Sequence, residues 1–401
     1  MYIRLCILFF LSLLILGCTE HGEYKNIVYF KNNSQEFNDS LTFKITGELS
    51  LPLDSVTTMS SSSLQVFYRR DSTRLFSILN PHNSEIAVYD YDSCKLINKI
   101  PVISDSVNGV GKTGSASAHF MINEDSIFLY NGRTLKAFLL NSHGQIIKKY
   151  TIIEKIDRNS NNSIPVPSTD KPIYVKDNKV YMICAWDRPR GFDQTKVLMV
   201  LFLDIVTGKI ERCFPKSNVY NSGNWGRNYL FSNLYGTYNI HTNKFIYSFA
   251  ADPFLFETSN IPGDSMVKHY VGSKFFREIN PMTHDRKKKV STEKSVIFDF
   301  TNPSFFQIIY DPFNDLYYRT TFLPIKKDEV NNPKKLSNRQ ETIIIMDKYF
   351  TKVGEYLMPR GRYMISNFFV TREGLHFLLK PELHKTQDSM VYEILKPIKL
   401  N

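Results

Sequence analysis

The sequence predicts an all-β protein, and within that class a six-bladed β-propeller. Three observations lead to this fold class: an apolar hairpin recurs along the chain, the composition favours strands, and a spare strand precedes the first repeat. Tyr and Phe are abundant, with 23 and 30 residues, and long runs of strong helix formers do not occur. Because aromatic side chains suit the pleated, half-buried surface of a sheet, this composition indicates strands rather than helices.

The recurring hairpin is an apolar strand that ends in an acidic or amide residue, turns, and leaves as a second strand headed by a basic or amide residue. Four copies occupy residues 86–100, 137–150, 201–213 and 344–356. A unit that recurs at the spacing of a blade is the signature of a repeat architecture. Asp and Asn side chains bond their own backbone in turns, so we expect Asp90, Asp204 and Asp347 to be turn residues rather than metal or catalytic groups.

The hairpins extend outward into four-stranded units bounded by Asn, Asp, Gly, Ser and Pro turn signals. The first five units are expected, innermost strand first, at residues 64–68, 74–79, 85–89 and 95–102; 119–122, 126–130, 135–140 and 145–152; 173–175, 179–184, 196–203 and 209–214; 234–240, 244–250, 254–257 and 266–271; and 304–310, 316–322, 342–346 and 353–358.

The last unit offers only three strands, at residues 365–370, 375–379 and 390–395. A ring of sheets must close on itself, and a strand from the other end of the chain would tie the first and last blades together. The segment Leu41–Leu53 is the spare strand, and we expect it to complete the sixth blade. A closed ring leaves only short, protected sheet edges, so residues 41–401 are expected to form one propeller.

The N-terminus predicts export. Residues 1–17 combine a basic start, a short apolar run and a small residue before Cys18, which is the pattern of a secretory signal peptide. The apolar run is shorter than the roughly 20 residues that a membrane-spanning helix needs. Ile15–Cys18 also resembles the lipobox of bacterial lipoproteins, in which Cys18 would receive the lipid. Residues 18–40 would then be the lipidated cysteine and a polar tether to a membrane surface.

The charge and the cysteines exclude some functions. The formal net charge is +11, but Lys and Arg are scattered instead of forming a basic patch with interleaved aromatics, so we expect no nucleic-acid partner. The three cysteines of the expected propeller, Cys94, Cys184 and Cys213, are an odd number and do not form a disulfide framework. No His-Glu-x-x-His zinc motif and no Gly-x-Ser-x-Gly nucleophile elbow occurs, so we expect no cofactor, no metal and no catalytic residue of these types.

A candidate ligand site lies in the loops that join the second and third strands of a blade or one blade to the next. The only two tryptophans, Trp186 and Trp225, fall in such loops and stand beside arginines. An indole stacks on sugar rings and a guanidinium holds carboxylates, which predicts a pocket for an acidic glycan or a peptide. The alternative is that each Trp packs under its own loop. The candidate ligand-binding residues are Trp186, Asp187, Arg188, Arg190, Trp225 and Arg227.

The chain also resembles a known family, the uncharacterised lipoproteins of the Bacteroides group with a TolB-like six-bladed propeller (domain of unknown function 4221). The likeness rests on Gly17-Cys18, on Leu51-Pro-Leu-Asp-Ser55 and the serine-rich stretch after it, on Tyr89–Asp92, and on Gly272–Phe276. The resemblance implies a lipid-anchored propeller over nearly all of the mature chain. It implies no activity, because the family has no established reaction.

Three functions follow as hypotheses. The first is a non-enzymatic lipoprotein of the cell envelope, on either side of the outer membrane, whose loop face binds a glycan, a peptide or an envelope protein. The second is an extracellular hydrolase or lyase acting on a polysaccharide or peptide, which would need two carboxylates, or a histidine with a carboxylate, at the channel mouth; Asp187, Asp193 and Asp252 are its acidic candidates. The third is a structural subunit of an envelope complex, which would need an exposed apolar patch.

Overall fold

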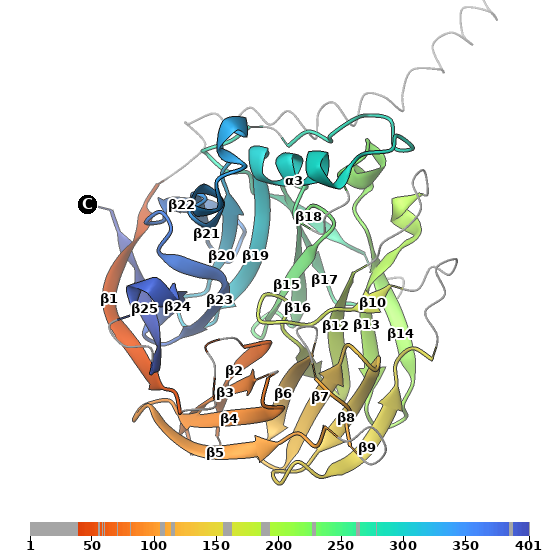
Figure 1. The fold of residues 1–401 in the computed structure, drawn as a ribbon, viewed down its shortest axis with the longest axis vertical. Helices are drawn as coiled ribbons and strands as arrows, with labels where there is room; N and C mark the ends of the chain where they lie inside the picture. The colour runs from red at the N-terminus through yellow and green to blue at the C-terminus, as the bar shows by residue number, and fades with distance from the viewer. Residues whose placement is uncertain are drawn as a thin grey trace, which may run out of the picture.

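The computed structural model describes residues 39–400 apart from 55–56, 58, 60, 70, 81, 105–108, 114–116, 155–162, 186–192, 227–229, 262–264, 278 and 385–387. These residues form six sheets set around a central axis (Figure 1). The prediction of a six-bladed β-propeller is therefore confirmed. The predictions for the signal peptide, for Cys18 and for most of the tether fall outside the described residues.

The first three sheets follow the expected order of strands. The first contains β2 (Ser63–Tyr68), β3 (Arg74–Asn80), β4 (Glu85–Asp90) and β5 (Lys95–Pro101). The second contains β6 (Ala118–Asn123), β7 (Ser126–Asn131), β8 (Lys136–Leu140) and β9 (Ile146–Thr151). The third contains β11 (Tyr174–Lys176), β12 (Lys179–Ala185), β13 (Leu198–Asp204) and β14 (Ile210–Pro215), and a short strand that we did not expect, β10 (Ile164–Pro165), also pairs with β12.

The fourth and fifth sheets are regular. The fourth contains β15 (Leu234–Asn239), β16 (Lys244–Phe249), β17 (Phe254–Thr258) and β18 (Val267–Tyr270). The fifth contains β19 (Ser304–Asp311), β20 (Leu316–Phe322), β21 (Glu341–Met346) and β22 (Lys352–Leu357).

The sixth sheet joins the two ends of the described chain. Its order is β1 (Leu41–Pro52), β25 (Ser389–Lys399), β24 (Gly374–Leu379) and β23 (Tyr363–Thr371). β1 and β25 are antiparallel, with Leu41 opposite Lys399 and Pro52 opposite Ser389, and the register shifts between Ile45 and Gly47. The outer strand of this sheet thus comes from the segment before the first repeat.

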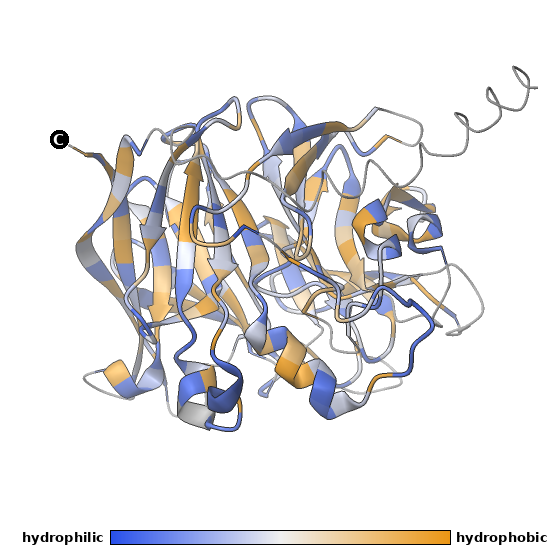
Figure 2. Cartoon of the chain, turned by 90° about the horizontal axis from the view of Figure 1, so that it is seen from above, coloured by the Kyte–Doolittle hydropathy of each residue, from blue (hydrophilic) through white to orange (hydrophobic). Residues whose placement is uncertain are grey.

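The blades present two different faces. The turn face carries the connections between the first and second and between the third and fourth strands of each blade, and the loop face carries the others. The described helical segments all lie in connections of the loop face: η2 (Gln194–Lys196), η3 (Asn218–Asn221), α3 (Thr292–Thr301), η4 (Lys327–Glu329), α4 (Pro333–Ser337) and η5 (Pro381–Leu383). Figure 2 shows α3 along its lower edge and the C-terminus at the upper left, on the turn-face side.

The helices α3 and α4 correct our expectation of plain loops in these segments. Helix α3 begins after Ser291, whose Oγ accepts a hydrogen bond from the Lys294 amide at 3.2 Å, and a serine in this position is a strong helix start signal. The helix buries Phe298 against the core on one side. We missed it because the surrounding segment is dominated by turn and charged residues, so the apolar period that marks a helix is weak.

Asx side chains close the hairpin turns, as predicted. Asp204 Oδ1 accepts hydrogen bonds from the amides of Val206 at 2.9 Å and Thr207 at 2.8 Å. The same type of contact occurs at the turns headed by Asp90, Asn141 and Asp347. These carboxylates and amides are occupied by their own backbone, which accounts for their recurrence without any ligand.

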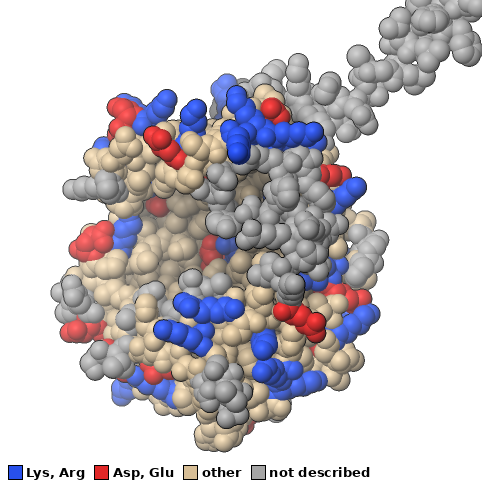
Figure 3. All heavy atoms as spheres, turned by 45° about the vertical axis from the view of Figure 1, so that its right-hand side comes forward, with Lys and Arg blue, Asp and Glu red and all other residues tan. Residues whose placement is uncertain are grey.

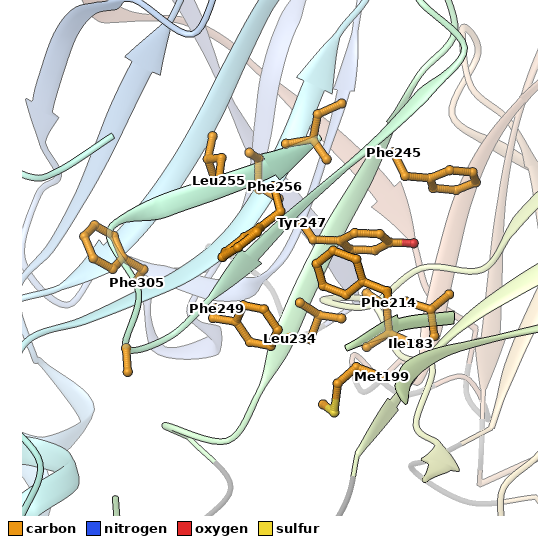
Figure 4. Close-up of a cluster of buried hydrophobic side chains, with 14 of the residues drawn as sticks. Ile183, Met199, Phe214, Leu234, Phe245, Tyr247, Phe249, Leu255, Phe256 and Phe305 are labelled. Carbon is orange, nitrogen blue, oxygen red and sulfur yellow. The ribbon is translucent and has the colours of Figure 1, made fainter. Parts of the chain in front are cut away.

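Neighbouring sheets pack face to face through aromatic side chains. The largest apolar cluster lies where the third, fourth and fifth blades meet (Figure 4), with the Phe214 ring 4.3 Å from that of Tyr247 and the Tyr181 ring 4.6 Å from that of Phe245. All six residues of β21 are buried. A strand covered on both faces reads as a continuous apolar run, which explains the Thr-Ile-Ile-Ile-Met sequence of β21.

The motif Gly272–Phe276 ties the fourth blade to the fifth. Ser273 Oγ and the Lys274 amide both donate to the carboxylate of Glu355, at 2.5 and 2.7 Å. Lys352 forms an ion pair with the same buried carboxylate and donates to Gly272 O at 3.1 Å. The motif that carries the family resemblance therefore has a structural role at a seam between blades.

Arg319 is the most deeply buried charge of this seam. Its side chain is 0% exposed, and it donates from β20 to Ser248 Oγ at 2.9 Å and to four backbone carbonyls of the fourth blade, those of Phe249, Asp252, Pro253 and Val271. The guanidinium carbon lies 3.6 Å from the ring centre of Phe305. Burial lowers the pKa of Arg319 to about 9, so the group stays charged at neutral pH and its donors satisfy acceptors that water does not reach.

Replacing Arg319 with Leu is expected to lower the free energy of unfolding by at least ~3 kcal/mol, since several buried carbonyls lose their donor at roughly 1–3 kcal/mol each. Urea denaturation followed by tyrosine and tryptophan fluorescence measures the loss. The control is Arg360→Leu, which removes an exposed arginine with one hydrogen bond to Asn338 O, and it should change stability by less than about 0.5 kcal/mol. Equal effects of the two variants would contradict the anchoring role of Arg319.

Candidate functional site

The central channel is the candidate site. It is a cavity of about 320 Å³ that the inner strands of all six blades line, and this volume lies at the lower end of the range of about 300–1,000 Å³ for small-molecule sites. Figure 3 views the loop face obliquely and shows it hollowed near the axis, with acidic side chains visible inside the hollow. The lining residues are Ser63–Val66, His119, Phe120, Thr169, Asp170, Pro172–Tyr174, Thr237, Tyr238, Ile240, Gln307–Tyr310, Pro312 and Phe368–Val370.

His119 lines the channel but is engaged between two serines. Its Nδ1 lies 2.7 Å from Ser63 Oγ and its Nε2 lies 2.8 Å from Ser77 Oγ. Ser63 Oγ also accepts from the His119 amide at 3.0 Å, so both ring nitrogens of His119 have a serine hydroxyl as partner. Burial lowers the pKa of His119 to about 3, which leaves a neutral ring that joins the first blade to the second and is a weak base.

Other polar groups along the channel also join blades. The Gln65 side chain is bonded to the backbone of Met121, accepting from its amide at 2.7 Å and donating to its carbonyl at 3.3 Å. Tyr174 donates to Gly236 O at 3.2 Å, and the Tyr310 amide donates to Thr237 Oγ1 at 3.0 Å. These groups have protein partners, so they hold the ring of blades together.

Much of the remaining channel wall is apolar, although Thr169, Asp170, Tyr238 and Gln307 also line it. Leu64, Val66, Phe120, Ile309 and Val370 come from four different blades and are only partly buried. Side chains of this kind give up water at a gain of about 25 cal/mol per Å² when a ligand covers them. The surface that the channel offers is therefore mainly hydrophobic.

The two ends of the channel differ. At the loop end, Asp170 forms an ion pair with Lys171 at 3.0 Å, and the Lys171 Nζ lies 5.0 Å from the ring centre of Tyr235. At the turn end, Tyr68 of the first blade and Phe313 of the fifth lie with ring centres 6.3 Å apart. The sixth blade lies between these two blades in the ring, so their contact covers its inner edge and narrows the turn end on that side.

Trp225 lies in the core, and the packing alternative describes it better than a stacking surface. It is 5% exposed and belongs to the largest apolar cluster. Its ring centre lies 5.9 Å from that of Tyr220 and 6.0 Å from that of Phe231. An indole that stacks on a ligand needs at least one exposed face, and a side chain that is 5% exposed offers none.

The loop that carries Trp225 is fixed by the segment before α3. The Asn224 amide donates to Thr283 O at 2.7 Å, and Asn224 Nδ2 donates to Lys288 O at 2.9 Å. A side chain at Gly223 would come within 2.4 Å of Thr283 O. The two between-blade loops thus pack on each other with no space for a Cβ at Gly223, and this contact fixes the loop in which Tyr220 and Phe231 cover Trp225.

The other candidate residues stand as follows. Trp186, Asp187, Arg188, Arg190, Arg227 and the lipidation candidate Cys18 lie outside the described residues. Asp193 accepts hydrogen bonds from the Thr195 amide at 3.1 Å and from Asn221 Nδ2 at 2.9 Å, and these and other hydrogen bonds lower its pKa. Asp252 is buried, accepts from Ser217 and has a raised pKa because of burial.

Those two carboxylates do not line the channel. In the described part of the chain, no group of three or more His, Cys, Asp or Glu side chains is arranged to hold a metal ion. The channel wall itself was not predicted, although its inner strands were. Its residues are separated by up to 300 positions in the sequence and meet only when the ring forms, so local pattern carries no signal for them.

The fold and the channel define a six-bladed propeller with a ligand-sized axial cavity. The chain belongs to the family described as domain of unknown function (DUF4221), whose model matches residues 38–357. The family resemblance noted from the sequence is confirmed. No curated protein is similar in sequence to this chain, and no described helix is long and apolar enough to cross a membrane.

Solved structures share the fold. A member of the DUF4221 family from Bacteroides vulgatus ATCC 8482 has a TM-score of 0.73 at 18% identity, and the match covers 90% of this chain and 100% of that one. A Bacteroides fragilis NCTC 9343 protein described as exported has a TM-score of 0.53 at 10% identity, with 92% of this chain and 98% of that one covered. Identities this low establish the shared fold and no shared ligand.

Stability is expected to fall as the pH drops from about 6.5 toward 4. Burial lowers the pKa of His119 to about 3 and that of His376 to about 4. The unfolded chain binds protons at these histidines below about pH 6.5 while the folded chain does not, and each such difference costs as much as ~1.4 kcal/mol per pH unit. Urea unfolding at a series of pH values measures the slope.

The variant His119→Gln should flatten this pH dependence, because it removes one of the two buried histidines. His143, an exposed residue of a hairpin turn, offers the matched control His143→Gln, which should keep the parent profile. A parent slope that survives in His119→Gln would show that the acid sensitivity arises elsewhere.

Proposed function

We propose that this protein is a lipid-anchored binding module of the cell envelope that takes a small apolar or amphipathic ligand, or an apolar side chain of a peptide, into the loop end of its channel. The observation that carries the proposal is that polar and apolar side chains of the channel wall have different partners. The polar groups Ser63, Gln65 and His119 are bonded to neighbouring blades, and the partly exposed surface that remains is apolar.

The loop end is the open one in this proposal. Tyr68 and Phe313 narrow the turn end, whereas Asp170 and Lys171 stand at the loop end as a paired charge that a polar head group could approach. Residues 186–190 follow directly after β12, which ends at Ala185 on the loop face. We retain the indole of Trp186 and the guanidinium groups of Arg188 and Arg190 as proposed contacts for the polar part of a glycan or peptide ligand.

The channel geometry favours binding over hydrolysis. A hydrolase or lyase would bring two carboxylates, or a histidine and a carboxylate, together at the mouth. Among the described lining residues, Asp170 is the one carboxylate and is paired with Lys171, while His119 contacts two serines. Membrane anchoring through Cys18 rests on the lipobox-like sequence.

Filling the channel should abolish ligand uptake. The variants Ile309→Trp and Val370→Trp place a large ring in the apolar wall, and binding of the apolar fluorophore Nile red should weaken by about tenfold or more, because the added ring takes the volume that the probe needs. Fluorescence titration measures the affinity. Ile97→Trp, on the exposed face of β5, is the matched control and should bind Nile red as the parent does. Equal affinity of all three variants for Nile red would show that the probe binds outside the channel.

Replacing Cys18 with Ser should release the protein from membranes. The parent chain is expected in the membrane pellet with the mass of a cleaved, lipidated protein, and Cys18→Ser in the soluble fraction, because a chain without acyl groups has no anchor. Cys94→Ser, which changes a cysteine of the folded part, is the control and should stay in the pellet. A Cys18→Ser chain that still pellets would contradict lipid anchoring.

A further inference from the structure

The exposed apolar side chains are distributed unevenly over the two faces. Among the described residues, nine large exposed apolar side chains lie in or beside the turns of the turn face, and four lie on the loop face. Scattered exposed apolar residues are normal on a protein surface, but a concentration on one face marks an interaction surface. The nine are Tyr68, Val206, Ile240, Ile261, Met266, Val267, Phe313, Tyr349 and Leu400.

Tyr349 is the most prominent of them. It is 73% exposed, and its turn is held rigid because Asp347 Oδ1 accepts hydrogen bonds from the amides of Tyr349 at 2.9 Å and Thr351 at 2.8 Å. The Lys348 Nζ lies 5.4 Å from the Tyr349 ring centre. A tyrosine with a lysine beside it combines an apolar body with polar tips, which is the chemistry that settles at a membrane–water interface.

A second group stands at the centre of the turn face. Tyr68 and Phe313 meet over the inner edge of the sixth blade, and the guanidinium carbon of Arg372 lies 6.0 Å from the Phe313 ring centre. Both aromatic side chains remain more than a third exposed. The turn face thus carries aromatic groups at its centre and at its rim.

The described chain also begins at the turn face, next to Tyr349. The Ser40 amide donates to Val353 O at 2.8 Å, and Ser40 O accepts from the Leu400 amide at 2.9 Å. Val353 is the second residue of β22, the strand that follows the Tyr349 turn. The segment that leads back to Cys18 therefore starts on the face where the exposed apolar side chains gather.

We infer that the turn face lies against the lipid surface to which Cys18 anchors the chain, with Tyr349, Phe313 and Val206 in the headgroup region. This inference rests on the lipid anchor of the proposed function. A tether raises the effective concentration of a surface next to the membrane, so contacts too weak to hold a free protein are enough to orient an anchored one. The open loop end of the channel then faces away from the membrane.

The shape of this surface favours a lipid bilayer over a protein partner. Apart from the Tyr68–Phe313 pair and the adjacent Met266 and Val267, the nine side chains come from separate turns or strand ends of the first, third, fourth, fifth and sixth blades. A protein partner would need a contiguous, complementary patch, whereas a fluid bilayer accommodates separate protrusions.

The test uses the full lipidated chain in zwitterionic phosphatidylcholine vesicles that contain brominated acyl chains, which quench tryptophan only at short range. Tyr349→Trp reports from the turn face and Leu383→Trp, also at an exposed position, from the loop face. The parent chain measures the constant signal of Trp186 and Trp225. We expect the added tryptophan to be quenched severalfold more strongly in Tyr349→Trp than in Leu383→Trp.

Vesicle flotation of the same samples measures membrane attachment, so it tests the anchor separately from the orientation. A chain that floats and shows equal quenching at both positions, or stronger quenching at Leu383→Trp, overturns the orientation while the anchor stands. A chain that floats with neither position quenched leaves the turn face free for a protein partner and also overturns the inference. A chain that does not float overturns the anchor and the orientation together.

Discussion

Each sheet of a propeller has two faces to bury, and the only cover available is the neighbouring sheet. This constraint governs the rest of the structure. It requires strands such as β21 to be apolar on both faces. It also fills the seams with apolar side chains, which are aromatic between Phe214 and Tyr247 and mainly aliphatic between the first and second blades. It also leaves backbone carbonyls at the seams without water, and Arg319 meets that need between the fourth and fifth blades by donating to four of them. A buried guanidinium that donates to backbone carbonyls fixes two blades relative to each other more specifically than apolar packing alone, because each N–H group needs an acceptor in one direction.

The channel is a consequence of the same constraint. Six sheets that pack face to face around an axis leave their inner edges free, and those edges must either fill the axis or line a cavity. Here the polar groups of the inner strands bind to adjacent blades, as His119 does with Ser63 and Ser77, and apolar side chains are left facing the axis. The contact between Tyr68 and Phe313 narrows the cavity at its turn end. A binding site of this type needs no catalytic group, and its selectivity comes from volume and from what the loops add at the mouth.

The two faces of the ring then acquire different roles. The loop face carries the helical segments and the long connections, which pack on one another as the Trp225 loop and the segment before α3 do. The turn face carries short, Asx-closed turns that are rigid and present side chains such as Tyr349 outward. Rigid turns suit contact with a surface, and longer loops suit contact with a ligand. The position of Ser40 beside β22 connects this asymmetry to the end of the chain that leads to the proposed anchor.

The sequence by itself determined the strands, the turns and the number of blades, because these depend on local alternation and on Asx side chains that bond their own backbone. Even the fourth blade, whose turn signals are weak, has its strands close to where the pattern placed them. The sequence by itself did not determine helix α3, the channel wall or the burial of Trp225. The loop in which Trp225 is buried is held by a segment about 60 residues away that packs against Gly223 and Asn224, and the wall of the channel needs side chains from all six blades. Which surfaces stay open was decided by the tertiary structure, since a side chain's access to solvent is set by distant segments that leave no mark on its own neighbourhood in the sequence.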